Sequence, residues 1–251
     1  MSKSLFSAVK NKLVDLTGIW FYKVNKLPVG THLYYFLKHR IRFPFQVIFD
    51  VGSNVGDTVL MYHKHFPQAR IYCFEPFAKA FGKLGKNTGG HPNIILNQLA
   101  LGDSIESLDI PLKSDEHTNV NTLKTETIGH GGSMGSERIS VETLDHYMEQ
   151  HPEIGQIDLL KIDTEGYDLK VLTGAHKTLS QAKAKMIFTE VGFSKENNLH
   201  VKLCEMIPFL EKYEYTFLGI FSMDVNNLHR RPQFGNALFI HRSLVNAVVN
   251  A

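Results

Sequence analysis

The sequence is poor in cysteine, with two among 251 residues. Two cysteines cannot build a disulfide framework, so the chain lacks the pattern of a small secreted scaffold. It also lacks an N-x-[ST] glycosylation acceptor and an unbroken apolar signal core among its first residues. These absences favour a reducing compartment, and we expect a cytoplasmic protein.

Long apolar runs are missing too. No stretch approaches the roughly 18 continuous apolar residues of a transmembrane helix, so we expect no membrane insertion. Charge is nearly balanced, because 27 Lys and Arg stand against 25 Asp and Glu. No run of basic residues dominates, which argues against a dedicated nucleic-acid-binding protein. The remaining composition, 43% hydrophobic and 21% charged, suits one α/β domain with a sizeable core.

The stretch from Gln46 to Pro76 has the pattern of a strand, a glycine turn, a helix and a second strand. Val47 to Phe49 is a short apolar run suited to a strand buried on both faces. Two glycines and an asparagine follow, and these residue types best tolerate positive φ. The second strand, Arg70 to Phe74, is followed directly by Glu75. Such a β-α-β unit places a ligand over the carboxyl ends of its strands, beside the helix N-terminus.

The glycine turn lacks the third glycine of a dinucleotide fingerprint, and the chain has no G-x-x-x-x-G-K-[ST] phosphate loop. Its D-x-G-x-[GN]-x-G spacing instead resembles motif I of the class I S-adenosylmethionine methyltransferases. The ligand of those enzymes has no pyrophosphate, but it needs backbone room for an amino-acid tail and an acceptor for two ribose hydroxyls. The implied cofactor-binding residues are Asp50, Gly52, Asn54, Gly56, Asp57 and Glu75. The alternative is a tight turn followed by a surface glutamate.

A second stretch, from Ile157 to Ala175, has the sequence IDLLKIDTEGYDLKVLTGA. It resembles the fourth strand and following helix of the FkbM-family methyltransferases, whose signature is K-I-D-[VT]-E-G-x-[ED]-x-x-V-L-x-G-A. The segments FDVGSNVGDT, FEP, NQLALGD and ISVETLD precede it in the family's order, so the resemblance extends from Phe45 to Ile240. On these motifs the chain is identified as a member of this family.

The resemblance implies the fold and the cofactor. We expect a doubly wound, mostly parallel, seven-stranded Rossmann-like α/β sheet in the order 3-2-1-4-5-7-6, with the last strand antiparallel, that binds S-adenosyl-L-methionine. Residues 1–44 are predicted to form an N-terminal helical cap that covers the cofactor, mediates a homodimer or simply packs, and residues 45–251 the methyltransferase domain. In the family fold the turn after the third strand lies near the adenine, so Ala100 and Asp103 are further cofactor candidates. Residues 113–137 are a candidate substrate lid, with a disordered insertion as the alternative.

Methyl transfer from a sulfonium is an in-line displacement, and a hydroxyl acceptor needs a base or a metal to become a good nucleophile. By resemblance, the carboxyl ends of the fourth and fifth strands face the departing methyl group. They carry the candidate catalytic residues Asp163, Glu165 and Glu190, and His229 is a fourth candidate. Asp163, also a cofactor candidate, and Glu190 are the predicted Mg²⁺ ligands. The structural alternative for Glu165 is a carboxylate favoured at a helix N-terminus, and a lone histidine among 13 is a weak signal.

The predicted activity is S-adenosylmethionine-dependent methylation, by resemblance of a hydroxyl on a sugar or a natural product. The expected partner is therefore a small molecule or a glycan. No N-P-P-Y-type tetrapeptide follows the fourth strand, which argues against methylation of exocyclic amines on nucleic acid. A cofactor-binding protein without catalysis is disfavoured by the three carboxylates, and an NAD-dependent oxidoreductase by the missing third glycine.

Overall fold

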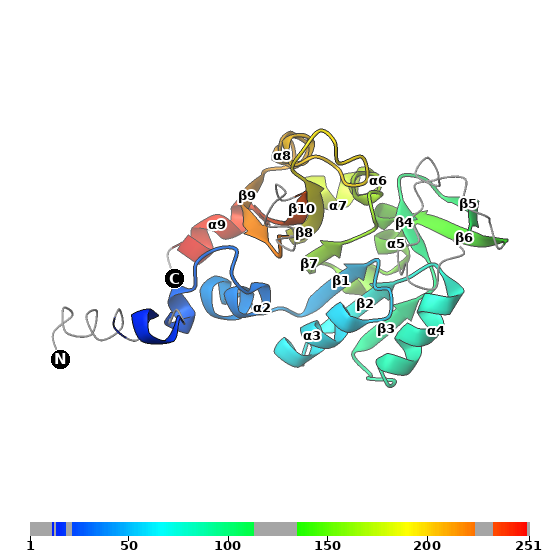
Figure 1. Ribbon diagram of the computed structural model, residues 1–251. Coiled ribbons are helices and arrows are strands. Elements are labelled where there is room, and N and C mark those ends of the chain that lie inside the picture. Colours follow the sequence, from blue (N-terminus) through cyan, green and yellow to red (C-terminus); the bar gives the residue numbers. More distant parts are fainter. Residues whose placement is uncertain (1–11, 13, 19–21, 113–134, 224–232, 250–251) are drawn as a thin grey trace.

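The computed structural model describes residues 12, 14–18, 22–112, 135–223 and 233–249 (Figure 1). Its main sheet has seven strands in the order β3-β2-β1-β7-β8-β10-β9. The strands are β1 (Val47–Val51), β2 (Arg70–Phe74), β3 (Ile94–Asn97), β7 (Ile157–Ile162), β8 (Ala184–Gly192), β9 (Tyr215–Phe221) and β10 (Phe234–His241). β10 runs antiparallel to both of its neighbours, β8 and β9, and the other neighbouring strands of this sheet pair in parallel. When only the strands of this sheet are numbered along the chain, β7 to β10 become strands four to seven and the order is 3-2-1-4-5-7-6. The predicted fold is therefore confirmed.

Helices cover both faces of the sheet (Figure 1). One face packs against α2 (Leu33–Phe36), α3 (Asp57–His65), α4 (Ala78–Asn87) and α9 (Arg242–Val249). The other packs against α5 (Leu144–Gln150), α6 (Asp168–Thr173), α7 (His176–Ser180) and α8 (Leu203–Glu211). Side chains of β1 alternate between the two cores: Ile48 belongs to the first and Phe49 to the second. Burial on both faces explains why the central strands are continuous apolar runs.

The third strand is shorter than the sequence predicts. Asn93 to Leu101 reads as one strand, but β3 ends at Asn97 and the chain then enters a second, three-stranded sheet. That sheet has the order β4-β6-β5, with β4 (Ala100–Gly102), β5 (Glu106–Pro111) and β6 (Ser136–Thr143). The amide of Asn97 donates to the Cys73 carbonyl at 3.1 Å and accepts from the Tyr147 hydroxyl at 3.1 Å, which holds the end of β3 in place.

Within the described part of residues 1–44, the segment 33–41 belongs to the domain core. A short 3-10 turn, η1 (Val24–Lys26), precedes α2, and a π-helical turn, η2 (Leu37–Ile41), follows it. Leu33, Phe36, Leu37 and Ile41 are buried against the α3 face of the sheet. A further 3-10 turn, η4 (Pro152–Ile154), follows α5. The division at residue 44, the homodimer and the cytoplasmic location stay predictions. No helix within the described residues is both long and apolar enough to cross a membrane.

Candidate active site

The glycine turn after β1 is built for close approach to the end of β7. Gly52, Asn54 and Gly56 have φ of 79°, 46° and 95°, in the left-handed region that glycine and asparagine adopt most easily. A β-carbon at Gly52 would lie 1.9 Å from the carbonyl oxygen of Asp163. The turn is fixed to β2, because the amides of Gly52 and Ser53 donate to the Phe74 carbonyl at 2.9 and 3.0 Å. Only glycine fits at position 52 without displacing the backbone.

Beneath this turn lies a buried ion pair. The Lys161 ammonium nitrogen is 2.7 Å from a carboxylate oxygen of Asp50 and 3.5 Å from one of Asp163, and it donates to the Gly52 carbonyl at 3.1 Å. Burial alone would lower the pKa of Lys161, but the two carboxylates raise it overall, so the lysine is charged. Asp50, predicted to contact the cofactor, is fully buried and instead holds the lysine that ties the glycine turn to β7.

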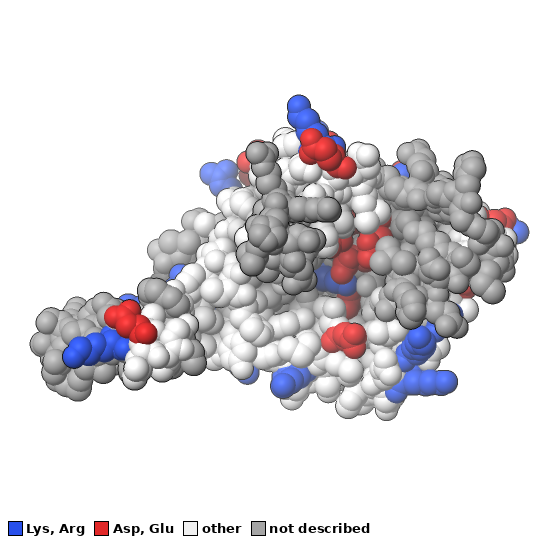
Figure 2. All heavy atoms as spheres, viewed as in Figure 1, with Lys and Arg blue, Asp and Glu red and all other residues white. Residues whose placement is uncertain are grey.

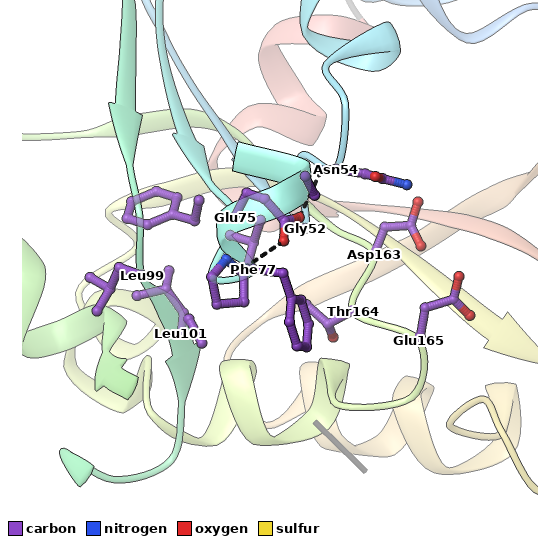
Figure 3. A pocket seen from close by; sticks show the side chains of 14 residues that line it. Gly52, Asn54, Glu75, Phe77, Leu99, Leu101, Asp163, Thr164 and Glu165 are labelled. Atoms are coloured by element: carbon purple, nitrogen blue, oxygen red, sulfur yellow. Dashed lines mark hydrogen bonds between the residues drawn. The ribbon is translucent and has the colours of Figure 1, made fainter. Parts of the chain in front are cut away.

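A cleft opens over the carboxyl ends of β1, β2 and β7 (Figure 3). Glu75 lies at the middle of this cleft. One carboxylate oxygen of Glu75 accepts the amide hydrogen of Asn54 at 2.9 Å and the other that of Phe77 at 3.0 Å. Burial raises the pKa of Glu75, opposed by these two hydrogen bonds. A carboxylate has about four acceptor positions, so each oxygen retains capacity for a ligand hydroxyl.

The two ends of the cleft differ in chemistry. Leu99, Ala100 and Leu101 give one end an apolar lining, and the carboxylates of Asp163 and Glu165 lie at the other (Figure 3). Because β3 already ends at Asn97, residues 99–101 cross to the second sheet and line the apolar end of the cleft. An elongated ligand with one flat apolar group and one cationic group fits this polarity.

The predicted site residues divide into three groups. Those that line the cleft are Gly52, Asn54, Glu75, Ala100, Asp163 and Glu165. Those outside its lining are Asp50, Gly56, Asp57, Asp103 and Glu190. Asp103, for example, lies 3.7 Å from the Lys170 ammonium nitrogen. His229 and most of the predicted lid, residues 113–134, lie outside the described residues.

Glu190 lies behind the charged end, in contact with a residue that the sequence analysis missed. Its carboxylate oxygen is 3.0 Å from the Nε2 atom of His200, and ligand atoms of Glu165, Glu190 and His200 all lie within 4.8 Å of one another. Figure 2 shows acidic side chains gathered in a hollow beside the carboxyl ends of the central strands. Burial, with Glu190 and Asp163 adding to it, raises the pKa of Glu165 to about 7. Asp163, predicted to share a metal with Glu190, is paired with Lys161 instead.

Comparison with known proteins gives the same family as the sequence motifs. The model of the methyltransferase FkbM domain matches residues 50–217. The 2-O-methyltransferase NoeI of Sinorhizobium fredii is 25% identical over 181 residues, which are 68% of this chain and 73% of NoeI. The hexuronic acid methyltransferase AglP of Haloferax volcanii is 28% identical over 146 residues, 58% of this chain and 56% of AglP. The match therefore spans a little over half of AglP.

The fold has a counterpart among solved structures. The crystal structure of the methyltransferase FkbM from Methylobacillus flagellatus superimposes with a TM-score of 0.51 at 14% identity, covering 79% of this chain and 44% of that one. At this identity the likeness concerns the fold. The domain model, by contrast, covers most of the chain, including the glycine turn, Glu75 and the KIDTEG segment at the end of β7. The chain therefore belongs to the FkbM-domain family of S-adenosylmethionine-dependent methyltransferases.

Proposed function

We propose that this chain transfers the methyl group of S-adenosylmethionine to a hydroxyl group of a sugar or of another small natural product. The observation that carries this proposal is the polarity of the cleft. A buried carboxylate, Glu75, lies between an apolar end and an end with two carboxylates, Asp163 and Glu165. A nucleoside with a sulfonium tail has the matching order of groups.

We propose a set of contacts for each part of the cofactor in this cleft. The adenine ring would lie among Leu99, Ala100 and Leu101, and the two ribose hydroxyls would donate to Glu75. The methionine tail would follow the backbone between Gly52 and Asn54, which lines the cleft. Its positive sulfur would then face Asp163 and Glu165. Two carboxylates near a sulfonium favour the bound cation electrostatically.

Methyl transfer requires an acceptor oxygen in line with the sulfur–methyl bond, with the reacting atoms about 3–3.5 Å apart. The oxygen–methyl bond forms as the sulfur–methyl bond breaks, and S-adenosylhomocysteine leaves with both electrons of that bond. The hydroxyl proton must go to a base, for which we propose Asp163. Its side chain is 37% exposed, so it is accessible from the cleft, and the Lys161 ammonium nitrogen lies 3.5 Å from one of its oxygens.

The acceptor class follows from charge and from the relatives. NoeI is named for 2-O-methylation and AglP for a hexuronic acid, which supports an oxygen on a carbohydrate. In this chain, Asp163, Glu165 and Glu190 would repel an acidic group close to the methyl group. We therefore propose a neutral hydroxyl at the reacting position. Nucleic acid is not proposed as the acceptor, because a net charge of +2 provides little attraction for a phosphate backbone.

Calorimetry tests the proposal. S-adenosylhomocysteine and, separately, NAD are titrated into wild type, Glu75→Ala and the control Glu153→Ala, which alters an exposed carboxylate outside the cleft. We expect micromolar binding of S-adenosylhomocysteine by wild type and the control, loss in Glu75→Ala, and no binding of NAD. Radiolabelled methyl transfer to a panel of neutral and acidic sugars then follows. Wild type that binds NAD, or that binds neither ligand, would contradict the proposal.

A further inference from the structure

Three side chains from three segments converge behind the charged end of the cleft. Glu165 comes from the turn after β7, Glu190 from β8, and His200 from the segment between β8 and α8. Their nearest carboxylate oxygens and imidazole nitrogen all lie within 4.8 Å of one another. Glu190 is 8% and His200 7% exposed, whereas Glu165 lines the cleft. Two carboxylates and an imidazole thus face one point that is partly shielded from water.

Neighbouring groups fix the orientation of the imidazole. The side-chain oxygen of Asn197 accepts from the amides of Leu199 and His200 at 3.1 and 3.0 Å, and its nitrogen donates to the Gln233 carbonyl at 3.0 Å. These bonds determine which way the amide points. The Nδ1 atom of His200 lies 2.9 Å from the Asn197 side-chain nitrogen and 3.1 Å from its oxygen. Phe234 stacks on the ring, with 4.5 Å between centroids and 22° between planes.

This orientation leaves the other ring nitrogen facing a carboxylate. Nε2 of His200 is 3.0 Å from Oε2 of Glu190, and within the described part of the chain that buried oxygen has no hydrogen bond of good geometry besides this ionic contact. Nδ1 has its partner on Asn197, and Nε2 faces the carboxylate. Metal-binding histidines commonly have this arrangement, in which a neighbouring polar group holds the second ring nitrogen. A cation between the two atoms would satisfy both.

We propose that Glu165, Glu190 and His200 bind a divalent cation of the first transition series, such as Mn²⁺ or Zn²⁺. A mixed set of one imidazole and two carboxylates suits these ions better than Mg²⁺, which prefers oxygen ligands alone. The site also differs from the predicted pair of Asp163 and Glu190, since it contains His200 and leaves Asp163 outside.

The role of this cation, unlike its binding, rests on the proposed function. Because Glu165 lines the cleft, an ion held by it could take the acceptor oxygen as a further ligand. A divalent cation lowers the pKa of a bound hydroxyl and so favours the alkoxide. Asp163, which is not a ligand, would then receive the proton. The ion would also offset the repulsion between the carboxylates and a polar acceptor.

Binding of Mn²⁺ to the chelator-treated full-length chain tests the site, with free Mn²⁺ measured by electron paramagnetic resonance. We expect one Mn²⁺ per chain, competed by Zn²⁺, and a dissociation constant about tenfold or more higher in Glu190→Gln, His200→Ala and Glu165→Gln. The matched control is Glu142→Gln, which removes a carboxylate 3.1 Å from the His146 ring at a partly exposed pair. It should bind as wild type does.

Titration of each variant with S-adenosylhomocysteine separates loss of the ion from loss of the fold. Wild type that binds S-adenosylhomocysteine but takes up neither Mn²⁺ nor Zn²⁺ would overturn the cation site alone. Equal Mn²⁺ affinity in wild type and Glu190→Gln would do the same. Stoichiometric Mn²⁺ binding by a chain that does not bind S-adenosylhomocysteine would support the site and contradict the proposed function, so the two failures are distinguishable.

Discussion

Asp50 on β1 and Lys161 on β7 are register neighbours in the central sheet, and their side chains form a buried ion pair at 2.7 Å. The lysine also holds the Gly52 carbonyl and lies 3.5 Å from Asp163. One ammonium group therefore joins the glycine turn, the interior of the sheet and a proposed catalytic carboxylate. This pair links folding to function, because the shape of the cleft depends on its being intact.

Removing one member of the pair should be costly. Lys161→Met leaves the Asp50 carboxylate buried without its counter-charge, and we expect a loss of about 3–5 kcal/mol in the free energy of unfolding. The double variant Lys161→Met with Asp50→Leu should recover part of this loss, since no unpaired charge remains. Urea denaturation measures both. Lys177→Met, which breaks the exposed pair with Glu149, is the control and should change little. A single variant as stable as wild type would contradict the role of the pair.

A second prediction concerns space at the glycine turn. Gly52 and Gly155 both have positive φ, 79° and 64°, but a β-carbon at Gly155 would meet no atom within 4 Å. Gly155→Ala should therefore cost only backbone strain, because φ 64° with ψ −56° is a γ-turn conformation that residues with a side chain rarely adopt, and it should leave cofactor affinity unchanged. Gly52→Ala must in addition displace the Asp163 carbonyl, so we expect binding of S-adenosylhomocysteine to be lost. Calorimetry on the two variants checks this, and equal affinities would refute the steric argument.

Much of this site could be predicted because parallel strands bring their carboxyl ends to one edge. The glycine turn, Glu75 and Asp163 each follow a short apolar strand, so their convergence follows from the strand order alone. Sequence patterns also give the residue type that each turn requires, as at Gly52. These features depend on local sequence and on a fold that the motifs identify.

Other features depend on long-range contacts that leave no local pattern. Asp50 matches a cofactor motif, but its burial is set by the pairing of β1 with β7, which places Lys161 beside it. His200 approaches Glu190 because Asn197 is bonded to the Gln233 carbonyl at the start of β10. The sequence predicts a helix from Leu199 to Tyr213, which would include His200, whereas α8 begins at Leu203. The Glu190–His200 contact depends on how the segments around Asn197 and Gln233 lie relative to each other, and hydrophobic periodicity in the sequence does not predict this.

Cofactor affinity should depend on pH through Glu75. Ribose hydroxyls donate to the ionised carboxylate, so protonation of Glu75 weakens binding. Because burial raises its pKa, this loss should begin at a higher pH than for an ordinary glutamate. Titration of S-adenosylhomocysteine between pH 8 and pH 5 should show affinity falling as pH falls. Glu75→Gln should bind weakly with no such slope, and a wild-type affinity independent of pH would exclude Glu75 as the ribose acceptor.

The last prediction separates binding from chemistry at Asp163. Asp163→Asn keeps the size of the side chain but removes the base, so we expect turnover to fall about 10²–10⁴-fold while the affinity for S-adenosylhomocysteine stays within a few-fold of wild type. The measurement pairs single-turnover methyl transfer with calorimetry. The control Asp109→Asn alters a carboxylate on β5, outside the cleft, and should keep full activity. If affinity and turnover fall equally, Asp163, which is paired with Lys161, supports the cofactor pocket and does not act as the base. Unchanged turnover would transfer the role of base to another group at the charged end.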